Sequence, residues 1–156
     1  MGSENLSEAM RIEKLLCFSL YASSRAMTDL YRPLLEEHGI TYPQYLVLVD
    51  LWEHGKRSVK EIGEILRLDS GTLSPLLKRL EASGMIRRVR RAEDERVVDV
   101  ELTESGRQLK KQGVKVLQAV AAQVGLPPKE VESLLSRLHQ LLGKLSTAAD
   151  AHSADR

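Results

Sequence analysis

Residues 58–84 have the sequence SVKEIGEILRLDSGTLSPLLKRLEASG, a pattern that predicts two short helices in succession. Ser58 and the glutamate three residues later form a capping box, so the first helix begins there. Asp69 or Ser70 caps the second helix, which Gly84 ends. A turn of three to four residues lies between the two helices, and this arrangement is that of a helix-turn-helix.

The second helix has one apolar and one polar face. Its leucines recur at the i, i+3, i+4, i+7 spacing of a buried stripe, whereas small hydroxyl side chains and two cations occupy the other face. Such a helix can enter a DNA major groove by its N-terminal end, because short side chains permit close approach and an arginine can bind guanine with two hydrogen bonds. A proline inside the helix removes one amide donor, which counts against this interpretation. The residues predicted to bind DNA are Ser70, Thr72, Ser74, Pro75, Lys78 and Arg79.

A period of two follows at residues 96–102, where valine and leucine alternate with other residues. Together with residues 85–91, this segment predicts an antiparallel hairpin with a charged tip at residues 92–95. A narrow minor groove attracts inserted arginine, so a basic hairpin beside a reading helix can clamp DNA. A solvated hairpin with compensating salt bridges has the same composition. The hairpin arginines predicted to bind DNA are Arg88, Arg90 and Arg96.

Charge is distributed unevenly along the chain of 156 residues. The formal net charge is only +1, from 23 Lys and Arg against 22 Asp and Glu. Residues 56–96 carry 11 basic and 7 acidic side chains, a net of +4, and the remaining chain has a net of −3. A basic centre between acidic flanks suits a module that faces a polyanion, although a locally solvated face produces the same pattern.

Apolar periodicity predicts further helices at residues 10–38, 41–55, 103–124 and about 129–148. Pro33 is expected to kink or split the first of them. Thr41 and Thr103 supply caps for the second and third. The expected fold class is therefore mainly α with a small β-hairpin wing, arranged as a winged helix-turn-helix.

Composition excludes several classes of site. A single cysteine rules out an internal disulfide and every multi-cysteine zinc site, and the four histidines lack the spacing of metal ligands. No metal or cofactor is therefore expected. No apolar run reaches about 18 residues, and the first ten residues do not resemble a secretory signal. The chain is expected to be cytoplasmic and to have no membrane partner.

The cysteine, Cys17, lies within the apolar residues 15–20 and, by the boundaries above, well inside the first helix. A buried structural thiol is the simplest interpretation. The start of the helix is too distant to favour a thiolate, because the dipole effect fades within the first turn. Tyr21 lies one turn on, and tyrosine hydroxyls can donate to a thiolate sulfur. With Tyr31 and Tyr42, it predicts a hydrogen-bond network around Cys17, for which aromatic filling of the core is the alternative.

Two motifs resemble the multiple-antibiotic-resistance regulator (MarR) family of transcription factors. Asp94-Glu-Arg96, followed by five residues and Leu102-Thr103, matches the family signature D-x-R-x5-L-T, and residues 68–81 look like its recognition helix. The resemblance covers about residues 10–145. It implies that Arg96 enters the minor groove and that Asp94 orients it.

The same resemblance implies a single domain, 1–156, that forms a homodimer. Residues 41–102 would be the winged helix-turn-helix that binds double-stranded DNA at a near-palindromic operator. Residues 10–38 and 103–148 would form the helical dimerisation region.

Four residues match a redox-sensing branch of that family, the organic hydroperoxide resistance regulators. Cys17, Tyr21, Tyr31 and Tyr42 recur at the spacing of that branch. The match implies that Cys17 is the peroxide-reactive thiol and that tyrosines, some from the partner subunit, donate hydrogen bonds to it. The implied function is a repressor that releases its operator when an organic hydroperoxide oxidises Cys17.

One departure from that branch matters. Many of its members carry a second, resolving cysteine, and this chain has none. An oxidised Cys17 must therefore react with a low-molecular-weight thiol, form a sulfenamide or overoxidise.

Three other functions compete with this interpretation. A MarR-type regulator released by a small phenolic ligand would use Cys17 only for packing. A thiol peroxidase would be an enzyme, but no second cysteine, histidine base or paired carboxylate accompanies Cys17, so no enzyme is expected. A helical interaction module would bind no nucleic acid.

Overall fold

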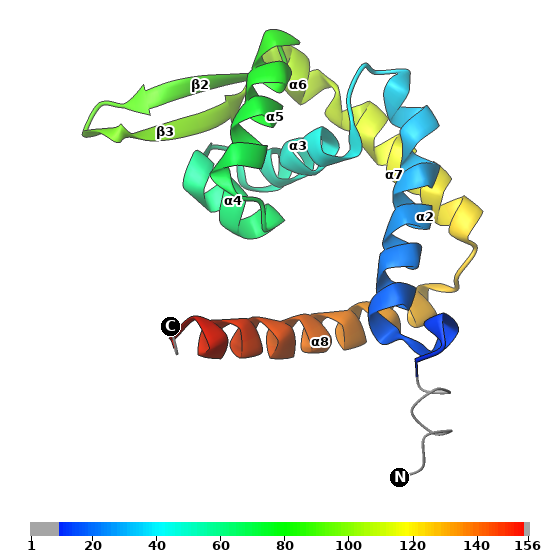
Figure 1. Cartoon of the computed structure of the whole chain (residues 1–156). Helices are drawn as coiled ribbons and strands as arrows, with labels where there is room; N and C mark the ends of the chain where they lie inside the picture. The colour runs from blue at the N-terminus through cyan, green and yellow to red at the C-terminus, as the bar shows by residue number, and fades with distance from the viewer. Residues whose placement is uncertain (1–9, 155–156) are drawn as a thin grey trace. The chain divides into compact units, whose positions relative to one another are not determined.

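The structure is a computed structural model that describes residues 10–154, with side chains described as far as residue 149. The chain divides into two compact units, Met1–Val120 and Ala121–Arg156, and each is described by itself. The elements of the first unit are η1 (Ile12–Lys14), α2 (Leu16–Glu36), α3 (Tyr42–His54), β1 (Arg57–Ser58), α4 (Val59–Leu66), α5 (Ser70–Ala82), β2 (Ile86–Arg91), β3 (Asp94–Leu102), α6 (Glu104–Gln108) and most of α7 (Lys110–Val124) (Figure 1). The expected fold class, mainly α with a small β-hairpin wing, is confirmed.

Local hydrogen bonds begin both helices of the helix-turn-helix, as predicted. The backbone N–H of Ser58 donates to Glu61 Oε2 (2.7 Å), and the N–H of Glu61 donates to Ser58 Oγ (3.2 Å), which completes the capping box of α4. At α5, Asp69 Oδ1 accepts a hydrogen bond from the N–H of Thr72 (2.9 Å), so Asp69 rather than Ser70 is the cap. The buried residues of α5 are Leu73, Leu77 and Leu80.

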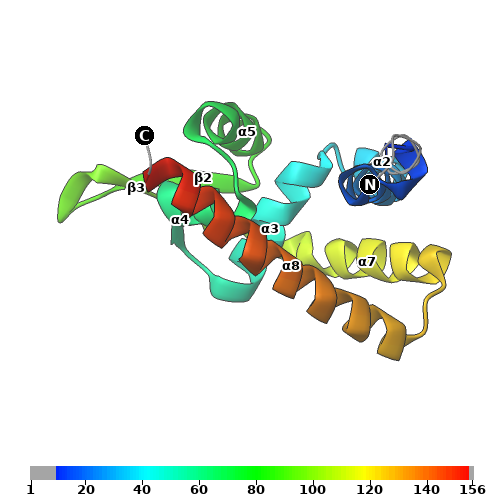
Figure 2. The ribbon, with the colours of Figure 1, turned by 60° about the horizontal axis from the view of Figure 1, so that its bottom comes forward.

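The wing belongs to an antiparallel sheet with the strand order β1–β3–β2. The predicted hairpin is confirmed, but its tip is shorter than residues 92–95, because β3 already begins at Asp94. The sequence does not reveal β1, since two residues are too few to display a period of two. β1 pairs Arg57 with Val100 and thereby joins the segment before α4 to the hairpin. The hairpin extends beyond α4 and α5 in both views (Figures 1 and 2).

The first predicted helix is shorter than expected. Leu15 has an extended backbone (φ −82°, ψ 115°), so η1 ends before it and α2 begins at Leu16. The helix then continues through Pro33 to Glu36, so of the two expectations for Pro33, a kink or a split, the split is wrong. The boundary at Leu16 changes the position of Cys17 relative to the helix start.

The later helices also differ in their boundaries. Residues 103–124 form two helices instead of one, because α6 ends at Gln108 and α7 begins at Lys110. Thr103 is the cap of α6, as expected, and its Oγ1 accepts a hydrogen bond from the N–H of Gly106 (3.1 Å). The last helix, α8 (Pro128–Ala154), is longer than the predicted 129–148.

Aromatic side chains pack α2 and α7 against α3. The ring centroids of Tyr31 and Tyr45 are 5.7 Å apart, and those of Tyr45 and Trp52 are 6.0 Å apart. The Trp52 indole N–H donates to the carbonyl of Gly106 (2.8 Å), and the Tyr45 hydroxyl donates to the carbonyl of Gly113 (3.0 Å). A Cβ at Gly113 would lie 2.5 Å from the Trp52 ring, so only glycine lets α7 approach so closely.

The second unit is formed mainly by α8, which exposes an apolar stripe. Within the described part of the chain, no helix is long and apolar enough to cross a membrane. The exposed apolar side chains of α8 are Val131, Leu134, Leu135, Leu138, Leu142 and Leu145.

Replacing Gly113 with alanine tests the packing of Trp52. We expect Gly113→Ala to lower the free energy of unfolding by about 1–3 kcal/mol, because the added methyl group overlaps the indole ring. Urea denaturation followed by circular dichroism measures this loss. The control is Gly143→Ala, since Gly143 has no heavy atom within 4 Å of its Cβ position and a helical glycine gains about 1 kcal/mol from this change. Equal stability of Gly113→Ala and the wild type would contradict the prediction.

Candidate nucleic-acid interface and thiol site

The polar face of α5 is fully available to a ligand. All six side chains predicted there, from Ser70 to Arg79, are exposed. Lys78 and Arg79 have no ion pair with any described residue. Pro75 lies within the unbroken helix, and the residue whose carbonyl loses its donor, Gly71, is exposed, so water can replace the missing N–H.

Asp94 holds Arg96 near the tip of the wing. One carboxylate oxygen, Asp94 Oδ1, accepts hydrogen bonds from both the backbone N–H and the Nε–H of Arg96 (3.1 Å each). The Arg96 side chain nevertheless remains 91% exposed. Its guanidinium is thus partly oriented while its outer edge stays free to donate.

Two other wing arginines have partners within the chain. The backbone N–H and the Nε–H of Arg88 donate to the two oxygens of Glu81 (2.8 Å each), which ties the wing to α5. These hydrogen bonds hold the pKa of Glu81 below its usual value. Arg90 donates to the carbonyl of Glu95 across the hairpin (3.1 Å). Arg88 is therefore more constrained than the sequence suggests.

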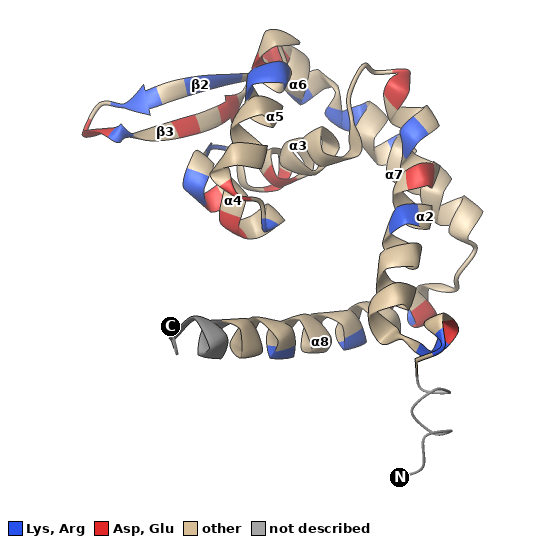
Figure 3. Ribbon diagram, viewed as in Figure 1, with Lys and Arg blue, Asp and Glu red and all other residues tan. Residues whose placement is uncertain are grey.

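A groove separates the start of α5 from the wing. Its volume is about 940 Å³, and the residues on its walls include Ser70, Ser74, Arg88, Arg91 and Arg96. In Figure 3, basic residues lie along β2 and near the hairpin tip, and acidic residues lie along β3 and at the tip. Of the predicted DNA-binding residues, the groove brings together Ser70 and Ser74 of α5 with Arg88 and Arg96 of the wing. The other predicted residues do not line it: Thr72, Pro75, Lys78, Arg79, Arg90 and Asp94.

Cys17 is an exposed residue in the first turn of α2. This position corrects the expectation of a buried thiol well inside the helix. The first N–H groups of a helix have no partner within it, and together with the helix dipole they favour negative charge nearby. Cys17 lies at the start of α2, whereas the predicted boundary placed it well inside a helix.

The three predicted tyrosines lie in different surroundings. The Tyr21 hydroxyl accepts a hydrogen bond from Arg25 Nη1 (2.9 Å), and the Arg25 guanidinium lies 5.7 Å from the Tyr21 ring centroid. Tyr31 is buried and Tyr42 is half-buried, with their ring centroids 4.9 Å apart. Burial raises the pKa of both Tyr31 and Tyr42, so their hydroxyls remain protonated donors.

Within one chain, Tyr31 cannot reach Cys17. Both lie on α2, and the difference of 14 in their residue numbers corresponds to about 21 Å along a helix. Tyr42 lies beside Tyr31 and is not brought to Cys17 either. Among the described residues, no side chain donates a hydrogen bond to the Cys17 sulfur, and the Tyr21 hydroxyl is bound by Arg25 instead.

Comparison with known proteins identifies the family. The sequence profile described as "Transcriptional regulator SarA/Rot" matches residues 29–112. The organic hydroperoxide resistance transcriptional regulator of Bacillus subtilis (strain 168) is 50% identical over 144 residues, covering 88% of this chain and 98% of that protein. The chain belongs to the SarA/Rot family of transcriptional regulators.

Other relatives support the same assignment. The HTH-type transcriptional regulator TtmR of Methylorubrum extorquens (strain PA1) is 45% identical over 149 residues, covering 96% of this chain and 76% of that protein. The structure of reduced AbfR bound to DNA has a TM-score of 0.74 at 39% identity, covering 91% of this chain and 99% of that one; AbfR comes from Staphylococcus epidermidis. The MepR–DNA complex from S. aureus has a TM-score of 0.75 at 25% identity, covering 83% of this chain and 98% of that one. The predicted MarR-type membership and hydroperoxide-resistance branch are confirmed, and the chain is a regulator rather than an enzyme.

The regulator also contains an ion-pair network that the sequence does not reveal. Asp99 is only 2% exposed, and its two oxygens accept hydrogen bonds from Arg91 Nε (3.1 Å) and Nη2 (2.6 Å). Lys56 Nζ lies 3.3 Å from Asp99 Oδ2. The hydrogen bond from Arg91 is the main cause that lowers the pKa of Asp99. The period of two in β3 places Asp99 among its polar residues, for which exposure is the ordinary expectation.

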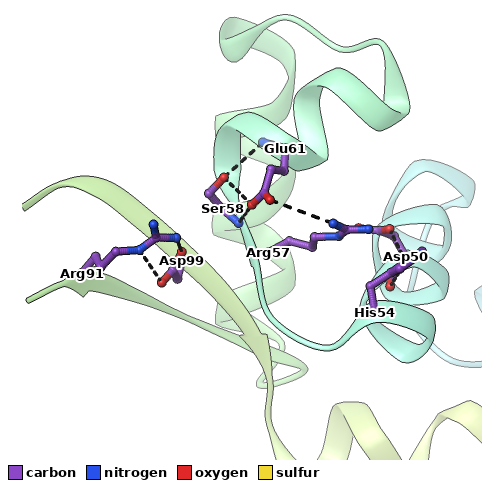
Figure 4. A network of polar contacts seen from close by, with 7 residues as sticks. All are labelled: Asp50, His54, Arg57, Ser58, Glu61, Arg91 and Asp99. Carbon is purple, nitrogen blue, oxygen red and sulfur yellow. Dashed lines mark hydrogen bonds and ion pairs between the residues drawn. The ribbon is translucent and has the colours of Figure 1, made fainter. Parts of the chain in front are cut away.

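A second, separate group of polar contacts links α3 to α4, and Figure 4 shows it together with the Arg91–Asp99 pair. The buried Asp50 carboxylate lies 3.0 Å from His54 Nδ1 and 3.6 Å from Arg57 Nε. Arg57 Nη1 in turn lies 4.0 Å from Glu61 of α4. The chain between α3 and α4 is thereby held at both ends, which supports the position of the helix-turn-helix in this regulator.

The cap of α5 leads to a prediction about pH. Hydrogen bonds from Thr72 lower the pKa of Asp69, so this carboxylate stabilises the folded chain above about pH 4, and that stabilisation is lost as the pH falls through the lowered pKa. We expect Asp69→Ala to unfold at lower urea concentration than the wild type at pH 7, with the gap narrowing towards pH 3. The matched control, Asp69→Asn, keeps an acceptor that does not titrate and should retain its cap at both pH values. An equal urea midpoint for Asp69→Ala and the wild type at pH 7 would contradict this role.

Proposed function

We propose that this regulator is a repressor that binds double-stranded DNA as a homodimer and releases its operator when an organic hydroperoxide oxidises Cys17. The observation that carries the proposal is the exposed Cys17 at the start of α2, in a chain 50% identical to an organic hydroperoxide resistance regulator. Because it acts on DNA, we assign it to the cytoplasm.

The homodimer rests on exposed apolar surface. The stripe on α8 and the exposed Leu16 and Phe18 beside Cys17 are too apolar for a surface that only water covers. A second copy covers them in this proposal. Residues 10–38 and 103–148 then form the dimerisation helices, and residues 41–102 form the DNA-binding region of one domain, 1–156.

Each subunit contributes one reading module to DNA. The exposed face of α5 enters the major groove, where Arg79 and Lys78 meet base edges or phosphates. Arg96, oriented by Asp94, enters the neighbouring minor groove. Two modules related by a twofold axis then read half-sites about one helical turn, roughly 34–36 Å, apart, which requires a near-palindromic operator.

Oxidation begins with attack of the Cys17 thiolate on the hydroperoxide. The sulfur bonds to the terminal oxygen, the O–O bond breaks, and the alkoxide takes up a proton and leaves as an alcohol, so that Cys17 becomes a sulfenic acid. A low-molecular-weight thiol then replaces the hydroxyl, forming a mixed disulfide and water. In the dimer, Tyr31 and Tyr42 of the second subunit donate to the thiolate, since neither reaches Cys17 within its own chain. Tyr21 completes the network from the same helix.

The mixed disulfide adds bulk where the thiolate accepted hydrogen bonds. The loss of these bonds shifts the start of α2 and alters the spacing of the two reading modules. A 100-fold weaker affinity for DNA requires about 2.7 kcal/mol of coupling, which is ordinary for linked sites.

One observation favours the alternative, a regulator released by a small phenolic ligand. A pocket of about 410 Å³ lies among α2, α3 and α7, and its walls include Tyr31, Tyr45, Trp52 and Leu117. A flat aromatic molecule suits such walls. In this alternative Cys17 is structural, so a cysteine variant separates the two functions.

Replacement of Cys17 tests the redox mechanism. We expect Cys17→Ser to bind DNA from the upstream region as the reduced wild type does, but to remain bound after treatment with cumene hydroperoxide, because serine cannot be oxidised. Gel shift and intact-mass measurement on the same samples follow DNA release and the mass gain together. Ser24→Ala on the same helix is the control and should release DNA like the wild type. Release of Cys17→Ser by the hydroperoxide would refute the mechanism.

Two arginines test the DNA surface. Arg79→Ala and Arg96→Ala should each weaken DNA binding by about 1–3 kcal/mol, since each removes one contact to a base edge or groove. Fluorescence anisotropy with a labelled duplex measures the affinity. Arg32→Ala removes the same charge from α2, where Arg32 pairs with Asp29, and should bind like the wild type. Unchanged affinity in both test variants would support a module that binds no nucleic acid.

A further inference from the structure

The arginines of the wing fall into two electrostatic classes. Arg96 near the tip is 91% exposed, whereas Arg91 on β2 has its guanidinium bound by the buried carboxylate of Asp99. Lys56, from the turn before β1, contacts the same carboxylate. One negative charge therefore lies against two cations, although nothing in the local sequence distinguishes Arg91 from its neighbours.

The two cations lie where they can still meet DNA. Arg91 is 42% exposed and lines the same groove as Ser70, Ser74 and Arg96, to which the proposed function assigns DNA contacts. Lys56 is 58% exposed. Both side chains are long enough to turn towards a phosphate backbone if their carboxylate partner is neutralised.

The burial of Asp99 between two cations is weak evidence for a role in stability. A buried ion pair loses much of its attraction to the removal of water, and apolar residues of similar size often serve equally well. Lysine and arginine that bind phosphates, in contrast, raise affinity for every DNA sequence alike. A carboxylate that pairs with such cations keeps them from the phosphates and so lowers the affinity for DNA of any sequence. Recognition then depends on the contacts in the grooves.

We propose that Asp99 is a specificity-determining residue of this regulator, because it holds Arg91 and Lys56 away from the DNA backbone. It acts through these two side chains and so is a positioning residue. The inference rests on the proposed binding of DNA. Discrimination between operator and random DNA then depends on α5 and Arg96, with Arg91 and Lys56 withdrawn from the phosphates.

Salt dependence of binding to a random-sequence duplex provides the test. Each cation that contacts a phosphate adds about 0.9 to the slope of log K against log[salt], so Asp99→Asn should steepen the slope by about 0.9–1.8. The ratio of the affinity at 50 mM salt to the affinity at 200 mM salt then increases by about 3.5-fold for each released cation. Affinity for random DNA at 50 mM salt should rise, and the ratio of operator to random affinity should fall.

Further variants connect the effect to the released cations. In the Asp99→Asn background, Arg91→Met should restore about half of the change in slope. Glu37→Gln, at the end of α2, removes one negative charge without releasing a wing cation and should leave the slope unchanged. An Asp99→Asn protein that is folded by circular dichroism but has an unchanged or shallower slope would overturn the proposal.

A second measurement does not depend on how well Asp99→Asn folds. In the otherwise wild-type chain, Arg91→Met should leave the slope unchanged, whereas Arg96→Ala should reduce it by about 0.9. An equal reduction in both variants would mean that Arg91 already contacts phosphates, and the proposal would be wrong. If the wild type itself binds no DNA, the proposed function fails instead, so the two failures are distinguishable.

Discussion

The contact between Trp52 and the backbone of α6 and α7 is the constraint on which the first unit depends. The indole N–H binds the carbonyl of Gly106, while its ring lies where any side chain at Gly113 would be. Tyr45 adds a second hydrogen bond to α7 and packs against Tyr31 of α2. The helix that begins the reading module is thereby joined to helices on either side of it.

The ability of each wing arginine to bind DNA depends on its carboxylate partner more than on the total charge of the wing. Arg88, Arg91 and Arg96 are similar in sequence, yet they bind Glu81, Asp99 and Asp94 respectively. Only Asp94 leaves its arginine almost fully exposed. The net of +4 in residues 56–96 already includes Glu81 and Asp94, whereas Asp99 lies outside that segment and pairs with one more of its cations. The ion pairs therefore leave Arg96 exposed to a ligand, whereas Arg88 and Arg91 hold parts of the fold together.

The parts of the fold that were predictable are those specified by nearby residues. The capping boxes, the leucine stripe of α5 and the hairpin all arise from interactions a few residues apart, and the structure confirms them. The sequence did not predict β1, because this strand is recognisable only through its pairing with β3. The start of α2 was predicted too early, because apolar periodicity continues across Leu15. The extended backbone of Leu15 interrupts the helix there. That difference moved Cys17 from the helix interior to its first turn.

The sequence by itself determined the two short capped helices, the basic hairpin, the single cysteine and the family resemblance. Tertiary structure decided which charges are free, and the extended backbone at Leu15 decided where Cys17 lies in its helix. The physical reason is distance along the chain. A cap bonds its partner three residues away, whereas Lys56 and Asp99 are 43 residues apart and meet only because β1 pairs with β3. Such long-range pairs depend on the path of the whole backbone, which no local pattern records.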